Sequence, residues 1–363
     1  MSTESMKLLE GFKLGEISLK NKAVMAPMTR SRATADHVPT AIMADYYGQR
    51  AEAGLIITEG TSPSPNGDGY ARIPGLYNEK QVQAWKEITS KVHEKEGKIF
   101  VQLMHTGRVS HPLNMAENTR VLGPSPIAVT STEMYTDQEG NQKLPVPEEM
   151  SKEDIQEAIV EYVNASKNAI AAGFDGVELH GANGYLIEQF INPGANQRSD
   201  EYGGSVENRA RFVLEVAEKV VAAIGKEKVG IRLSPGGAFN DVVPFDGQEE
   251  TFSYLAEKLG KLGLVYIHLV DHSSMGTPNV PDEIKKTIKE QFGGTIILSG
   301  GYDKERAEAD LSSELGDLIA FGRPYIANPD LLSRFQSDAE LNQPNFDTFY
   351  TPGEIGYTDY PTL

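Results

Sequence analysis

The chain has 363 residues and a formal net charge of −18, from 34 basic and 52 acidic side chains, and it contains no cysteine. This charge disfavours nucleic acid and anionic membranes as partners, because both are themselves negative. The missing cysteine excludes disulfides, iron–sulfur clusters, cysteine-ligated zinc and thiol nucleophiles. The first residues lack the apolar core of a signal peptide, and no apolar run reaches the ~18 residues of a membrane span, so we expect a cytoplasmic protein.

Short β-rich runs alternate with amphipathic helical patterns eight times along the chain. Each run is almost continuously apolar, as in strands that are buried on both faces of a parallel sheet. The predicted strands are Lys22–Ala26, Leu55–Thr58, Ile99–Leu103, Gly176–His180, Val229–Leu233, Val265–Val270, Thr295–Ser299 and Leu318–Phe321. Eight βα units predict a (β/α)8 TIM barrel, with a single domain over residues 1–363. A doubly wound sheet is the alternative, and it is disfavoured by the number of units and by the lack of G-x-G-x-x-G after a strand.

The segments between these strands add three further expectations. Ser151 and Ser205 stand directly before helical patterns of period 3.6 and are predicted N-caps. The long connection after the third strand contains a turn-like stretch at residues 137–141 between two β-rich segments. Because long connections in compact domains are usually functional, we predict that residues 106–150 form a β-hairpin lid over the barrel mouth. The aromatic and glycine-rich residues 349–360 are expected to fold back onto the body.

The most informative segment is the run from His180 to Arg209, which follows the apolar strand Gly176–Leu179. It places an imidazole, an amide and a phenol, those of His180, Asn183 and Tyr185, directly at a strand end. The imidazole and the amide can both donate hydrogen bonds to one oxygen, and the phenol is an acid that can deliver a proton. These three groups could together reduce a polarised C=C bond, if a nearby group supplies hydride. A lone histidine at a strand end is more often structural, so the hypothesis rests on all three residues.

Other polar or glycine-rich residues follow the predicted strands at the same end of the barrel, where TIM barrels form their active sites. The glycine pairs and Arg323 after the last two strands suit a phosphate, because bare N–H groups and a guanidinium bind anions. A simple turn is the alternative interpretation of the glycines. The candidate cofactor-binding residues are Pro27, Met28, Thr29, Gly60, Gln102, Arg232, Ser299, Gly300, Gly301, Phe321, Gly322 and Arg323. No motif predicts a metal site.

The run from His180 to Arg209, together with the strand ends, resembles the Old Yellow Enzyme family of FMN-dependent ene-reductases. The resemblance extends from Leu8 to Leu363. It implies non-covalent FMN and NADPH or NADH as the reductant, with Arg232 at the N1–C2=O edge of the flavin and Gln102 at its C2=O and N3. It further implies a hydrogen bond from Thr29 to the flavin C4=O and backbone contacts from Pro27, Met28 and Gly60.

The resemblance also implies a ping-pong reaction on α,β-unsaturated carbonyl, imide or nitro compounds. His180 and Asn183 would hold the substrate oxygen, FMN N5 would pass hydride to the β-carbon, and Tyr185 would protonate the α-carbon. Further residues expected to shape the pocket are Tyr70, Met104, Ile127, His272 and Tyr350. Some relatives have tryptophan where this chain has Met104, so we expect a more adaptable pocket.

Two alternatives to this function remain open at the level of sequence. The first is a flavin-binding sensor or storage protein without alkene turnover. The second is a barrel hydrolase or lyase that uses Glu178 and His180 as acid and base. The sequence permits a monomer or a homodimer with small-molecule partners.

Overall fold

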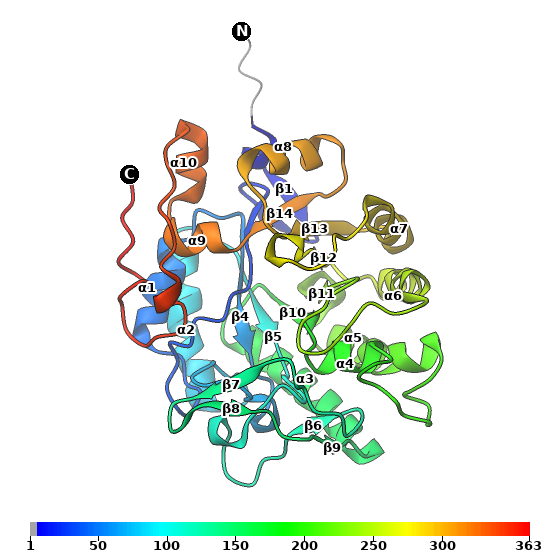
Figure 1. The fold of residues 1–363 in the computed structure, drawn as a ribbon. Coiled ribbons are helices and arrows are strands. Elements are labelled where there is room, and N and C mark those ends of the chain that lie inside the picture. The colour runs from blue at the N-terminus through cyan, green and yellow to red at the C-terminus, as the bar shows by residue number, and fades with distance from the viewer. Residues whose placement is uncertain (1–5) are drawn as a thin grey trace.

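The computed structural model describes residues 6–363, and its central feature is a closed barrel of eight parallel strands (Figure 1). Around the barrel the strands follow the order β10-β11-β12-β13-β14-β3-β4-β5, and β5 pairs with β10 to close the ring. The strands are β3 (Ala23–Met25), β4 (Leu55–Thr61), β5 (Ile99–Leu103), β10 (Gly176–Gly181), β11 (Val229–Leu233), β12 (Tyr266–Val270), β13 (Thr295–Ser299) and β14 (Leu318–Phe321). The predicted TIM barrel is therefore confirmed, with differences only at strand ends.

Helices surround the barrel on its outside (Figure 1). They are α1 (Ala41–Gln49), α2 (Glu79–His93), α3 (Lys152–Ala171), α4 (Leu186–Ile191), α5 (Val206–Ile224), α6 (Gln248–Leu262), α7 (Asp282–Phe292), α8 (Lys304–Ser312), α9 (Arg323–Ala327) and α10 (Leu331–Ser337). Both predicted N-caps are confirmed, because Ser151 accepts a hydrogen bond from the Asp154 N–H and Ser205 accepts one from the Asn208 N–H. No helix in the described part of the chain is long and apolar enough to cross a membrane.

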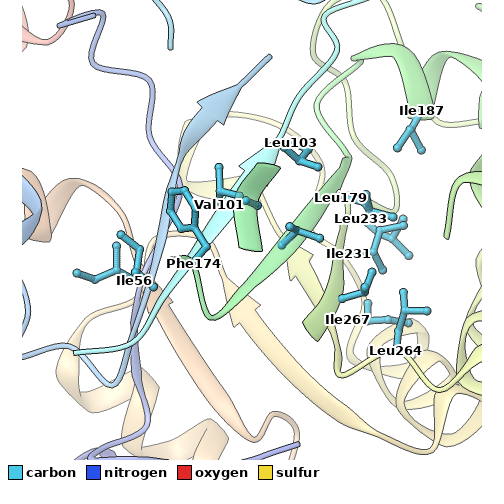
Figure 2. Close-up of a cluster of buried hydrophobic side chains, with 14 of the residues drawn as sticks. Ile56, Val101, Leu103, Phe174, Leu179, Ile187, Ile231, Leu233, Leu264 and Ile267 are labelled. Atoms are coloured by element: carbon cyan, nitrogen blue, oxygen red, sulfur yellow. The ribbon is translucent and has the colours of Figure 1, made fainter. Parts of the chain in front are cut away.

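Alternating strand residues divide the interior into an outer and an inner core, because successive side chains of a strand point to opposite faces. Side chains such as Ile56, Leu179 and Ile231 belong to the outer core between strands and helices (Figure 2). The inner core fills one end of the barrel with residues such as Phe100 and Tyr266. A short hairpin of β1 (Phe12–Leu14) and β2 (Ile17–Leu19) adds Leu14 and Leu19 to this inner core.

Further along the same strands, the inward positions become polar. They are occupied by Gln102, Glu178, His180, Arg232, His268 and Ser299, all of which are buried. Burying so many polar groups costs free energy unless each finds a partner. The carboxyl end of the barrel is therefore built for polar chemistry, and the opposite end for packing.

The long connection after β5 contains a hairpin at the predicted place. Strands β7 (Glu133–Thr136) and β8 (Gly140–Lys143) pair antiparallel, while β6 (Leu122–Gly123) and β9 (Glu148–Glu149) pair parallel beside them. An ion pair of 2.9 Å between Arg72 Nε and Asp137 Oδ2 ties the hairpin turn to the loop after β4.

The residues near the C-terminus fold back onto the start of the barrel, as predicted. The Arg30 guanidinium donates to the carbonyl oxygens of Phe349 at 3.1 Å and of Gly356 at 2.8 Å. Arg32 donates to the carbonyl of Thr348, and the buried rings of Tyr46 and Tyr357 stack with centroids 4.0 Å apart. These contacts fix the chain directly after Thr29 through residues more than 300 positions away in the sequence.

Candidate active site

Strand register brings three basic side chains side by side at the carboxyl end of the barrel. His180 on β10 pairs in register with Arg232 on β11, and Arg232 pairs with His268 on β12. Two positions along β10 from His180 lies Glu178, which is fully buried. Its Oε1 accepts from Gln102 Nε2 at 2.8 Å, and its Oε2 contacts the Tyr266 hydroxyl and His268 Nδ1, both at 2.9 Å. We call Gln102, Glu178, Arg232, Tyr266, His268 and Ser299 the floor network.

The electrostatics of the floor network favour an anionic carboxylate beside a fixed cation. Burial alone would raise the pKa of the Glu178 carboxyl, but His268 and Arg232 outweigh it and hold that pKa below its ordinary value. Arg232 donates from Nη2 to the Ser299 hydroxyl at 3.3 Å, while its buried Nε has no hydrogen-bond partner among residues 6–363. An unsatisfied buried guanidinium N–H is costly, so this arrangement fits a bound group that presents an electronegative edge. The N1–C2=O edge of FMN has that chemistry.

His180 is held in one tautomer by the backbone that follows it. Its Nδ1 accepts from the Ala182 N–H at 3.3 Å, which leaves the proton of the neutral ring on Nε2. Burial, reinforced by the charge of Arg232, lowers the pKa of His180 well below 6.5. At neutral pH the side chain is therefore an uncharged donor.

Asn183 sits in a sharp turn that a buried carboxylate supports. Asn183 and Gly184 have φ angles of 60° and 78°, in the left-handed region that asparagine and glycine tolerate best. The Asn183 N–H donates to Ser234 Oγ at 3.1 Å, and Ser234 in turn donates to Glu188 Oε1 at 2.8 Å. The other Glu188 oxygen accepts from the Gly184 N–H at 2.6 Å. Because of these bonds the turn is fixed, and the Asn183 side chain leaves it in a defined direction.

Tyr185 lies between His180 and an open cavity. Its ring is 4.9 Å from the His180 ring, centroid to centroid, and its hydroxyl is 2.9 Å from that of Tyr70. Burial raises the pKa of the Tyr185 phenol, which therefore keeps its proton at neutral pH. The cavity has a volume of about 690 Å³ and includes Thr29, Tyr70, Met134, Tyr185 and Tyr350 in its wall. Its lining also includes residues of the β7–β8 hairpin and of the segment 346–352.

The glycines after β13 and after β14 differ in how much space surrounds them. Gly300 has a φ of 126°, and a Cβ there would lie 1.8 Å from the Asp271 carbonyl oxygen, so no other residue fits. A Cβ on Gly322 would meet only the Met28 sulfur, at 3.5 Å, which leaves room near the N-terminus of α9. Arg323 at that terminus is exposed and has no ion-pair partner within residues 6–363. The open backbone and the free guanidinium fit a phosphate.

Three predicted site residues lie in places that their sequence positions did not indicate. The Phe321 side chain points outward and packs against Tyr325 and Phe335, so only its backbone faces the barrel end. Met104 is buried, and a Cβ on Gly60 would lie 2.5 Å from its sulfur. The thioether packs over Gly60, and the residues that line the cavity include Tyr70 and Tyr185 but not Met104, His180 or Asn183.

The family of the chain follows from comparison with known proteins. The model of the NADH:flavin oxidoreductase / NADH oxidase family matches residues 7–342. The chain belongs to this family. A curated relative, the probable flavin mononucleotide-dependent alkene reductase of Leishmania infantum, is 41% identical over 98% of this chain and 97% of its own length.

Two solved structures show the same relationship. The structure of morphinone reductase in complex with tetrahydroNAD superposes with a TM-score of 0.93 at 42% identity, covering 98% of this chain and 97% of that one. The Old Yellow Enzyme homologue from Zymomonas mobilis superposes with a TM-score of 0.93 at 40% identity, covering 98% of this chain and all of the other. The predicted membership of the Old Yellow Enzyme family is confirmed, and with it an FMN-dependent oxidoreductase that uses NAD(P)H.

Several residues that shape the site were not identified from the sequence. Ser234, Glu188 and Asn240 hold the turn at Asn183, since the Asn240 side chain donates to the Asn183 carbonyl at 2.8 Å. Arg72 joins the mouth segments through Asp137 and the Tyr350 carbonyl. The alternation of side chains along β12 could have revealed His268. It lies two residues from the inner-core Tyr266 and therefore also points into the barrel.

Proposed function

We propose that this chain is an ene-reductase in which His180 and Asn183 bind the oxygen of an activated alkene and Tyr185 supplies a proton. The observation that carries the proposal is the convergence of a neutral imidazole, an oriented amide and a protonated phenol at one strand end, beside a large cavity. The proposed substrates are small α,β-unsaturated carbonyl, imide or nitro compounds, in agreement with the alkene reductase named among the relatives.

Two hydrogen bonds to one substrate oxygen withdraw electron density from the conjugated double bond. The Nε2–H of His180 and the amide of Asn183 would donate these bonds, so the β-carbon becomes electrophilic. FMN, when bound, supplies the hydride that this carbon accepts. Tyr185 would then protonate the α-carbon, and its proximity to the Tyr70 hydroxyl offers a partner for the phenol oxygen after the transfer.

We assign the cofactor contacts to the strand ends described above. Arg232 and Gln102 would meet the polar edge of the flavin ring, with Thr29, Pro27 and Met28 on its other side. The phosphate would be bound by Ser299, Gly300, Gly301, Gly322 and Arg323. This assignment accounts for the unpartnered Arg232 Nε and for the exposed Arg323.

The hydrolase alternative is disfavoured by the state of Glu178. Both of its oxygens are already engaged by Gln102, Tyr266 and His268, and it has no exposed surface. A general acid or base must reach the substrate proton directly or through one water. The cytoplasmic location, the monomer or homodimer, and the absence of nucleic-acid partners stay predictions, which fractionation, light scattering and gel-shift measurements would check.

The test of the proposal is the absorbance spectrum of the purified protein under anaerobic conditions. We expect a flavin band that bleaches on addition of NADPH and returns when 2-cyclohexenone is added. A band that returns only with oxygen would contradict the substrate class, and a protein with no flavin band after FMN is added back would overturn the whole assignment.

A further inference from the structure

The orientation of the Asn183 amide depends on a residue far from its own motif. Asn183 Oδ1 lies 2.7 Å from His272 Nε2, on the loop that follows β12. The backbone of Asn183 is already fixed by Ser234 and Asn240. Its last freedom is rotation of the amide, which exchanges the carbonyl oxygen and the NH2 group.

The two ends of an amide have opposite hydrogen-bonding roles. The oxygen only accepts and the NH2 only donates. A substrate carbonyl or nitro oxygen is an acceptor, so it binds Asn183 only when the NH2 end faces it. A rotated amide would set two acceptors against each other, and a donor on the far side of Asn183 prevents that rotation.

The packing of its ring and the hydrogen bonds of its loop hold His272 in a fixed position beside this amide. Its ring packs edge-on against Phe239, with centroids 4.5 Å apart and an interplanar angle of 75°. The preceding Asp271 anchors the loop by accepting from the backbone N–H groups of Ser273 at 2.9 Å and Val280 at 3.1 Å. Close packing of Gly300 against the Asp271 carbonyl joins this loop to the loop after β13.

The charge state of His272 suits the same role. Burial, reinforced by Arg232, lowers the pKa of its imidazole to about 4, so the ring is neutral at neutral pH. A neutral ring avoids a second positive charge beside Arg232, and it still offers one N–H.

We propose that His272 is a positioning residue that donates from Nε2 to Asn183 Oδ1 and so turns the Asn183 NH2 toward the substrate oxygen. This inference rests on the proposed function, because it assigns a task to a group that the reaction uses. It further implies that the site selects ligands with an acceptor oxygen at this place over ligands with a donor there.

The test is a titration of the flavin-containing protein with p-hydroxybenzaldehyde, followed by the change in flavin absorbance. We expect His272→Phe, which keeps an aromatic ring beside Phe239, to weaken binding about tenfold, since a correctly oriented hydrogen bond is lost. His272→Gln restores a donor and should recover most of the affinity. His93→Phe, a change at a surface histidine paired with Asp175, is the matched control and should leave the affinity unchanged.

A double-mutant cycle separates this role from a general loss of structure. In an Asn183→Ala background, His272→Phe should cause no further loss, because the amide that it orients is gone. Additive losses in the double variant, or wild-type affinity in His272→Phe, would overturn the proposal. If the flavin of the wild-type sample is still bleached by NADPH and reoxidised by 2-cyclohexenone, such a result would contradict only the role of His272. The proposed function would remain supported.

Nitrogen NMR of the wild-type protein, labelled at histidine, shows which ring nitrogen of His272 carries the proton. This measurement does not depend on whether a variant folds. We expect the His272 ring to carry its proton on Nε2. A ring protonated only on Nδ1 would overturn the proposal, because Nε2 would then be an acceptor facing the NH2 end of Asn183.

Discussion

The floor network and the mouth of the cavity differ in how their polar groups are bonded. On the floor, Glu178 is buried and accepts three hydrogen bonds from side chains of two other strands, β5 and β12. At the mouth, Tyr185 is half-buried and its hydroxyl lies 2.9 Å from the Tyr70 hydroxyl. In the proposed function a floor residue would therefore support both the barrel and the cofactor, whereas a mouth residue would be free to bind the substrate. A substitution in the floor network should thus lower the stability of the protein. A substitution at the mouth should lower only the rate of the reaction.

The largest effect is expected for Glu178→Ala. The change leaves the donors of Gln102, Tyr266 and His268 without an acceptor and removes the negative charge that faces Arg232. Breaking such a buried charge arrangement costs about 3–5 kcal/mol, and the variant should also lose FMN. Urea unfolding and the flavin content after desalting measure the two effects. Glu178→Gln, which keeps the volume, should be milder. An unchanged urea midpoint in the alanine variant would contradict the view that the floor network contributes more to stability than the mouth does.

An intermediate effect, confined to rate, is expected for Tyr185→Phe. Loss of a positioned general acid slows catalysis by about 10²–10⁴-fold, so reduction of 2-cyclohexenone should fall while NADPH still bleaches the flavin. Stability should change little, because the lost hydroxyl has one partner at the mouth. Stopped-flow absorbance separates the two half-reactions, and Tyr70→Phe is the control for the loss of a neighbouring hydroxyl. Full enone turnover by Tyr185→Phe would remove this residue from the role of proton donor.

The smallest effect is expected for Asp137→Asn in the turn of the β7–β8 hairpin. The Asp137 carboxylate is partly exposed, with 42% of its side chain accessible, although it pairs with Arg72 at 2.9 Å. Exposed ion pairs contribute about 0–1 kcal/mol, so the melting temperature should fall slightly in dilute buffer. The difference from wild type should vanish in high salt, because exposed charges are then screened. A loss as large as that of Glu178→Ala would show that the mouth supports the fold as strongly as the floor does.

The fold was predictable because each barrel strand is a short apolar run. Strands buried on both faces, such as β5 and β11, are recognisable without knowledge of their neighbours. The spacing of His180, Asn183 and Tyr185 was equally visible, since the first lies near the end of β10 and the other two lie in the turn that follows it. Their immediate surroundings were also predicted to carry polar groups, because the carboxyl ends of barrel strands meet at one end of the molecule.

The contacts that orient these residues were not predictable, because they join distant parts of the chain. Ser234 lies 51 residues from Asn183 and His272 lies 89 residues from it, so no local pattern connects them. The directions of the Met104 and Phe321 side chains were not predictable for another reason. Each stands at a strand end, where the sequence alone does not decide which face the side chain takes. Phe321 follows the inward-facing Ala320 and so points outward into the core.

The contacts of Arg30 and Arg32 with residues 348–356 affect the order in which the molecule can be assembled during synthesis. These arginines leave the ribosome early and border Thr29, which lines the cavity. Their carbonyl acceptors at residues 348–356 are made much later, as is β14, the partner that β3 needs to close the barrel. A nascent chain therefore carries these two guanidinium groups without most of their backbone acceptors until residues 348–356 are made. A fragment that ends before residue 348 would keep all eight barrel strands but lose these acceptors, so the segment after Thr29 that borders the cavity should be left without its support.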